Sequence, residues 1–110
     1  MHICDAFGVI DMRVGRILKI DEFSRANQEL YKIKVDFGPE IGCKWSAMEA
    51  KKYYSKEELL SSLVIGVVNI GPKNIAGFIS EVLILGTRSE DDGLSLIVPN
   101  RSAKLGAKIY

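Results

Sequence analysis

The sequence predicts an all-β fold with one short helix, in which five strands form a closed antiparallel barrel. Residues Tyr31 to Phe37 alternate strictly between apolar and charged side chains, which is typical of a half-buried strand. The runs 63–70 and 82–85 are apolar and β-branched, and they are too short for buried helices. The capping-box motif from Ser55 to Glu58 predicts the helix. These patterns place three strands before the helix and further strands after it.

The first strand is expected over residues 12–20. Its apolar positions include Val14 and then Ile17, so the alternation slips beside Gly15. Such a slip indicates a β-bulge, which bends a strand and helps a sheet to close into a barrel.

The second and third strands are expected to form a hairpin. Residues 37–40 read as a turn, and residues 41–47 alternate again. On this alternation Trp45 is expected to point inward, with a role in base stacking as the alternative. Lys44 and Ser46 are then expected on the outer side, with Lys32 and Lys34 of the preceding strand.

The remainder of the chain supplies the last strands and the two ends. The glycine-containing connection 71–77 is expected to be poorly ordered, residues 90–93 read as a turn, and strands are expected over 94–98 and near 107–109. Three strands, a helix and further strands are typical of the OB fold. Residues 1–110 are therefore interpreted as a single OB-fold domain. The apolar terminal segments, Ala6–Ile10 and Leu105–Tyr110, are expected to form a dimer interface.

Composition narrows the class of protein further. The 110 residues are 47% hydrophobic, which suffices for one core, and charged residues interrupt every apolar run before the ~18 residues that a membrane span needs. The start of the chain does not resemble a secretory signal. Cys4 and Cys43 are far apart in the sequence, as suits a reducing compartment. We therefore expect a cytoplasmic protein without membrane insertion.

The residues offer no basis for catalysis. His2 is the only histidine and lies beside the chain terminus, so a nucleophile system that needs histidine has no firm support. Two distant cysteines and one histidine do not suggest a metal site, and the glycines do not follow either phosphate-loop spacing. We expect no enzyme, no cofactor and no metal, and the function is expected in a binding surface.

Two surfaces are candidates. The first is the outer side of the second and third strands with Lys32, Lys34, Lys44 and Ser46, which is either an ordinary solvated face or an RNA-binding face. The formal net charge is only +1, but alternation can gather lysines on one face of a nearly neutral chain. The second is the connection 69–81, whose Ile75, Phe78 and Ile79 either cap the barrel or contact a ligand.

Five sequence blocks resemble the tRNA-binding-domain family of OB folds, and they run in order through the chain: Arg13–Ile17, Leu30–Asp36, Tyr53–Tyr54, Val68–Lys73 and Gly77–Glu81. That family includes stand-alone tRNA-binding proteins, the C-terminal domain of many methionyl-tRNA synthetases, and the CsaA-type export-related chaperones. The blocks Val35–Glu40, Lys44–Ala47 and Ile75–Gly86 are most similar to the CsaA type. The resemblance implies a homodimer, and it implies these RNA-facing residues: Lys32, Ser46, Asn69, Lys73, Ser80 and Glu81.

Two functions follow as hypotheses. The first is a non-enzymatic homodimer that binds tRNA or structured RNA. The alternative is an export-related chaperone that binds unfolded or secretory polypeptides in an apolar cleft at Ile75, Phe78 and Ile79. Association with an aminoacyl-tRNA synthetase is a third alternative. A basic groove along the second and third strands would favour RNA, and an apolar cleft beside residues 71–77 would favour polypeptide.

Overall fold

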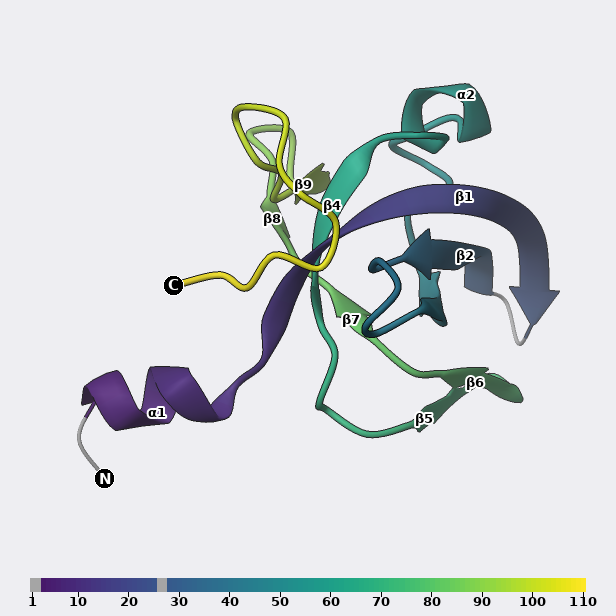
Figure 1. Ribbon diagram of the computed structural model, residues 1–110. Coiled ribbons are helices and arrows are strands. Elements are labelled where there is room, and N and C mark those ends of the chain that lie inside the picture. Colours follow the sequence, from purple (N-terminus) through teal and green to yellow (C-terminus); the bar gives the residue numbers. More distant parts are fainter. Residues whose placement is uncertain (1–2, 26–27) are drawn as a thin grey trace.

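Five antiparallel strands form the body of the molecule and coil into a nearly closed barrel. The computed structural model describes residues 3–25 and 28–110, so His2 lies outside the described residues. The strands are β1 (Met12–Arg25), β2 (Gln28–Asp36), β3 (Cys43–Met48), β4 (Leu63–Val67) and β7 (Leu83–Ile84). They are hydrogen-bonded in the order β3-β2-β1-β4-β7 (Figure 1). This arrangement confirms the predicted OB-type barrel.

The bulge in β1 is present, a few residues later than the parity slip indicated. Ile17 pairs with Val35 and Lys19 pairs with Lys34, which leaves Leu18 as the extra residue. Gly15 serves packing, because a Cβ atom there would lie 2.8 Å from Cε1 of Phe37. A larger residue at this position would displace the core ring that fills the barrel.

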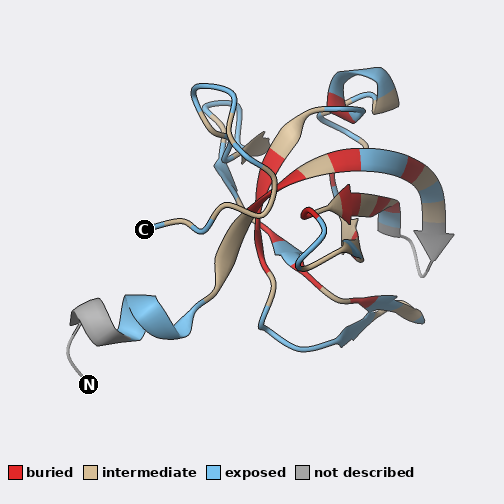
Figure 2. Ribbon diagram, viewed as in Figure 1, coloured by how far each residue is buried: buried red, intermediate tan, exposed pale blue. Residues whose placement is uncertain are grey.

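The core lies inside the barrel, where Figure 2 shows buried segments on β1, β2 and β4. The largest fully buried side chains are those of Phe37, Ile17, Ile33, Leu59, Val35, Val64 and Val82. They come from β1, β2, β4, α2 and the connections. Along β2 the buried residues Tyr31, Ile33 and Val35 alternate with the less buried Lys32 and Lys34, which confirms the predicted alternation of that strand.

The predicted helix is α2 (Lys56–Leu59). Glu58 donates its backbone N–H to Oγ of Ser55 at 3.1 Å, and Ser55 donates its own to Oε1 of Glu58 at 2.9 Å, which confirms the capping box. A second helix, α1 (Ile3–Val9), precedes β1 and extends away from the barrel in Figure 1. Residues 6–10 are all exposed. Among the described residues, no helix has the length and apolar character required to cross a membrane.

The connection 71–77 was expected to be poorly ordered, and that expectation is wrong. It contains β5 (Lys73–Ile75), which pairs with β6 (Phe78–Ser80) in a tight hairpin. The two turn residues, Ala76 and Gly77, have φ values of 52° and 90°, as a two-residue turn with primed geometry requires.

The C-terminal third adds a hairpin and a paired tail. Strands β8 (Gly86–Arg88) and β9 (Leu94–Leu96) flank the predicted turn at residues 90–93. The strand expected near 107–109 is reduced to a bridge between Arg13 and Lys108. Hydrogen bonds from Gly106 to Val14 and from Ile109 to Met12, at 2.8 and 2.9 Å, align this tail with the first half of β1.

Candidate functional site

The outer face of β2 and β3 carries a different set of residues from the predicted one. Lys32 lies opposite Ala47 and Lys34 lies opposite Trp45 in the antiparallel register. Residues that pair directly in a sheet share a face, so Trp45 lies beside the two lysines. The inward orientation predicted for Trp45 is therefore wrong. We call Lys32, Lys34, Trp45 and Ala47 the outer face.

Lys44 and Ser46 lie on the other side of β3, so their predicted placement beside Lys32 and Lys34 is also wrong. Lys44 is opposite Val35, and Ser46 is opposite Ile33. Ser46 is only 2% exposed. Oγ of Ser80 lies 3.5 Å from Oγ of Ser46 and 3.2 Å from the Val82 carbonyl oxygen, so its single hydroxyl proton can be donated to either acceptor. A partner from a distant segment makes a hydroxyl tolerable at this buried position.

Three aromatic rings gather beside the outer face, and we call Phe23, Trp45 and Phe78 the aromatic cluster. The Phe78 ring lies 6.2 Å from the Trp45 ring in an edge-on arrangement and 6.1 Å from the Phe23 ring. Nζ of Lys32 sits 4.5 Å from the centre of the Phe23 ring and 4.9 Å from that of Phe78. These cation–π contacts hold the ammonium group of Lys32 at a defined place on the surface.

Glu81 is engaged with the edge of β3. Trp45 donates its backbone N–H to Oε1 of Glu81 at 3.1 Å, and Glu81 donates its backbone N–H to the Trp45 carbonyl at 2.8 Å. Glu81 was expected to face RNA. In the structure its carboxylate accepts a hydrogen bond from the Trp45 backbone.

Asn69 lies at the junction of α1 and β1, apart from the lysines. Its Oδ1 accepts from the N–H of Asp11 at 2.9 Å, and its Nδ2 donates to the Val9 carbonyl at 2.8 Å. At the same junction the Arg13 guanidinium contacts Asp11 at 2.6 Å. This hydrogen bond is the main reason that the pKa of Asp11 lies below its ordinary value of 3.8. Asn69 therefore ties α1 to the barrel.

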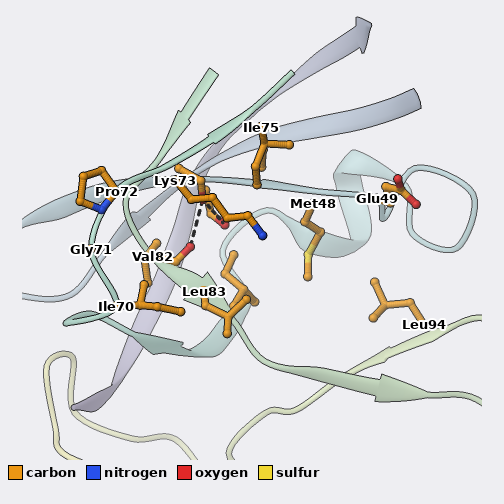
Figure 3. A pocket seen from close by; sticks show the side chains of 14 residues that line it. Met48, Glu49, Ile70, Gly71, Pro72, Lys73, Ile75, Val82, Leu83 and Leu94 are labelled. Atoms are coloured by element: carbon orange, nitrogen blue, oxygen red, sulfur yellow. Dashed lines mark hydrogen bonds between the residues drawn. The ribbon is translucent and has the colours of Figure 1, made fainter. Parts of the chain in front are cut away.

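An apolar pocket of about 510 Å³ lies between the end of β3, the β4–β5 connection and β7. Figure 3 shows the Lys73 side chain extending across this pocket toward Met48. Buried Ser46 and Ser80 also line it, and the other lining residues are Ala47, Met48, Glu49, Ile70, Gly71, Pro72, Ile75, Val82, Leu83, Ile84 and Leu94. Lys73, Ser46 and Ser80 thus line one pocket, and Asn69 is not among the residues that line it.

Of the three residues predicted for polypeptide binding, two share a face of the β5–β6 hairpin and the third does not. Ile75 pairs directly with Phe78, and Ile75 lines the apolar pocket while the Phe78 ring belongs to the aromatic cluster. Ile79 pairs with Asn74 on the opposite face of the β5–β6 hairpin and is 50% exposed. The apolar cleft expected beside residues 71–77 exists, but with a different set of walls.

Sequence reasoning missed Phe23 and ranked Trp45 first as a core residue. The chain's only tryptophan lies between Lys44 and Ser46, and this position was the available signal for a surface role of Trp45. Ser46 can point inward in its place because the hydroxyl of the distant Ser80 offers it a hydrogen-bond partner. In the part of the chain that the structure describes, no three His, Cys, Asp or Glu side chains are placed to hold a metal ion.

Comparisons with a family model and with solved structures both find similar proteins over most or all of this chain. The family model described as "Putative tRNA binding domain" matches residues 12–108. The crystal structure of a CsaA chaperone protein from Picrophilus torridus is similar at 42% identity, with a TM-score of 0.91 and full coverage of both chains. That of chaperone CsaA from Bacillus anthracis has 36% identity and the same TM-score, and 100% of this chain aligns with 99% of that one.

The similar curated sequences include much longer proteins. The methionine–tRNA ligase of Pyrococcus abyssi is 38% identical over 107 residues, which cover 96% of this chain and 14% of the ligase. The chain thus spans about 14% of the length of the first curated relatives that it matches.

Proposed function

Because this chain belongs to the tRNA-binding-domain family, we propose that it binds tRNA or another structured RNA, without catalysis, through the outer face of β2 and β3. The observation that carries the proposal is the cross-strand pair of Lys34 and Trp45, with Lys32 on the same face. A cation beside a half-buried ring on the surface can contact a phosphate while the ring stacks on the attached base.

Each group has a definite part in this proposal. The Trp45 ring stacks on an unpaired base, a contact that is worth ~1–3 kcal/mol per base in single-stranded RNA complexes. Lys34 reaches a phosphate next to that base, and Lys32 presents an ammonium that Phe23 and Phe78 hold in place. Structured RNA offers such bases in its loops, and duplex RNA does not.

The modest charge sets the expected strength. With a formal net charge of +1 and few lysines on the face, counterion release contributes little, so binding is moderate and depends on RNA shape.

Trp45 supplies an intrinsic reporter, since it is the only tryptophan. In a titration with tRNA, Trp45 fluorescence is expected to change on binding. Lys34→Gln is expected to weaken binding and to lower the salt slope by about 0.7 to 0.9. The control is Lys56→Gln, on α2 outside the outer face. If tRNA binds with no fluorescence change, and equally well to the Lys34 variant, this face is not the RNA site.

We further propose that the protein is a homodimer through its terminal segments. Phe7, Val9 and Ile10 are 44%, 59% and 45% exposed, on and just after a helix that extends from the barrel. Tyr110 at the other end is fully exposed. An apolar helix of this kind is stabilised when a second copy covers it. Light scattering is expected to show a dimer for the wild type and a monomer for Phe7→Ser with Ile10→Ser. A monomeric wild type would exclude the dimer.

A second candidate function is polypeptide binding, as in a chaperone, and the apolar pocket favours it. Its volume of about 510 Å³ and its mainly aliphatic walls suit a large apolar side chain of an unfolded or secretory polypeptide. Two of the solved structures that match this chain over its full length are of proteins named as chaperones.

The β5–β6 hairpin offers a matched pair of variants for this candidate. Ile75 lines the pocket, and Ile79 faces the other way. Suppression of the aggregation of a denatured client is expected to fall with Ile75→Ser and to persist with Ile79→Ser. Equal effects of the two changes, or no suppression by the wild type, would remove this function.

A cytoplasmic location and an association with an aminoacyl-tRNA synthetase complete the proposal. The matching region is one part of methionine–tRNA ligases, which makes such an enzyme a reasonable partner. Sedimentation of the purified protein with methionyl-tRNA synthetase from the same organism tests this association. Independent sedimentation of the two proteins would exclude it.

A further inference from the structure

A second basic surface lies outside both the outer face and the apolar pocket. It is a shallow pocket of about 360 Å³, formed by Arg16 of β1, by Ser62 and Leu63 where β4 begins, and by residues 98–102. Arg101 from that last segment is its second arginine, and Asn100 and Ser102 add polar side chains. We call it the arginine pocket. No acidic residue lines it.

The guanidinium of Arg16 is held in place by the protein. Its NH1 group donates to the Ser61 carbonyl at 2.7 Å, and among the described residues its other N–H groups have no acceptor. The acid nearest by register is Asp36, which lies opposite Arg16 on β2. Asp36 accepts the backbone N–H of Gly38 at 2.8 Å and forms no ion pair with Arg16. The positive charge of Arg16 therefore remains available to a ligand.

Arg101 is exposed and, within residues 3–25 and 28–110, has no hydrogen-bond or ion-pair partner. Two guanidinium groups with neighbouring hydroxyl and amide donors form a concave set of donors. Arginine forks match the oxygens of a phosphate group, and serine and asparagine can donate to the oxygens that remain.

We propose that the arginine pocket binds a phosphate group, and that in the complex of the proposed function this group belongs to the RNA backbone. This inference rests on the proposed function, because the bound RNA of that function supplies the phosphate group. Lys19 lies opposite Lys34, and Arg16 precedes Lys19 by three residues in β1. At about 3.3 Å per residue, Arg16 lies about 10 Å along the strand from Lys19.

The basic groups thus follow one path across β1. Lys34 on the outer face is followed by Lys19, by Arg16 and by Arg101 in the arginine pocket. Lys19 contacts Asp21 at 3.8 Å, but both side chains are about half exposed, so water screens this pair. An RNA strand whose base lies against Trp45 can continue along this path, and the arginine pocket then receives a phosphate beyond the outer face.

The test compares RNA with a free anion on the same preparations. Arg101→Gln is expected to weaken tRNA binding about tenfold, as for a lost charged hydrogen bond, and to lower the salt slope by about 0.7 to 0.9. Arg88→Gln, an exposed arginine on β8, is the control and should leave both unchanged. Inorganic phosphate should shift the amide resonances of residues 100–102 in the wild type and not in Arg101→Gln.

The two proposals fail in different ways. If Arg101→Gln binds tRNA with wild-type affinity and slope, the arginine pocket does not contact RNA, while the outer face can still be the RNA site. If the wild type does not bind tRNA at all, the proposed function fails. In that case phosphate shifts at residues 100–102 would still support the arginine pocket as a phosphate site, and their absence would overturn it.

Discussion

Glu81 and Trp45 exchange two hydrogen bonds, one in each direction, and so join β3 to the segment that follows β6. The Glu81 carboxylate takes the N–H of Trp45, and the Glu81 backbone donates to the Trp45 carbonyl. Since β3 is the terminal strand of the five-stranded sheet, this contact covers part of its free edge. The same contact fixes the backbone that carries the Trp45 ring.

Glu81→Ala is expected to lower the free energy of unfolding by about 1–3 kcal/mol, because the N–H of Trp45 loses its acceptor. Glu81→Gln keeps a side-chain oxygen and should retain part of the stability. Urea unfolding measures both changes. The control is Glu49→Ala, an exposed acid just after β3, with an expected effect within about 0.5 kcal/mol. An effect of Glu81→Ala no larger than that of Glu49→Ala would contradict the structural role.

Gly15→Ala is expected to destabilise the barrel by about 1–3 kcal/mol through overpacking. The new methyl group would meet Val35 and Phe37, which are both fully buried. Thermal unfolding measures the change. Gly8→Ala in α1 is the matched control, since nothing lies within 4 Å of its added Cβ atom. Equal melting temperatures for the wild type and Gly15→Ala would show that the core side chains can move to accommodate the added methyl group, which would contradict this prediction.

Asn69→Ala is expected to speed hydrogen exchange at the backbone amide of Asp11, because that N–H loses its side-chain acceptor. The exchange of the Val68 amide reports on the backbone bond beside it, to the Asp11 carbonyl at 2.9 Å. RNA affinity should change little if Asn69 serves only the α1–β1 junction. A large loss of RNA binding with unchanged exchange at Asp11 would assign Asn69 to the RNA contact instead.

The Asp11–Arg13 pair predicts a dependence of stability on pH. The pKa of Asp11 is lowered in the folded state, chiefly by the hydrogen bond from Arg13, although burial opposes the shift. The ionised carboxylate therefore stabilises the fold above its ordinary pKa of 3.8, and this contribution is lost as pH falls through the lower folded pKa. Asp11→Asn should lose less stability on acidification below pH 4 than the wild type.

Urea unfolding at several pH values measures how the free energy of unfolding changes with pH. Arg13→Gln removes the partner and keeps the Asp11 carboxyl, and its stability should also fall less on acidification than that of the wild type. If the free energy of unfolding of Asp11→Asn changes with pH as it does for the wild type, the Asp11–Arg13 pair does not contribute to folding stability.

Local patterns predicted the elements well because their causes are local. The alternation of Tyr31 to Phe37 depends on neighbouring residues and one buried side, and the capping box joins Ser55 to Glu58, only three residues on. The bulge in β1 was indicated by a parity slip within the strand itself. The β5–β6 hairpin was missed because its strands are three residues long, which is too short to show an alternating pattern of apolar and polar residues.

The side of β3 on which Trp45 lies was not predictable in the same way. Alternation states only which residues share a face, and the burial of Ser46 opposite Ile33 decides which face is inside. That burial depends on the hydroxyl of Ser80, which lies 34 residues away.

The sequence by itself determined the strands of the barrel, the capped helix, the OB arrangement and the family, because each depends on neighbouring residues or on sequence blocks along the chain. Only the tertiary structure decided which of the family's polar positions are hydrogen-bonded within the protein itself. Glu81 bonds to Trp45 across 36 residues, and Asn69 bonds to Asp11 and Val9 across 58 and 60. Barrel closure brings these partners together, so a polar side chain that looks available in the sequence is already bonded in the fold.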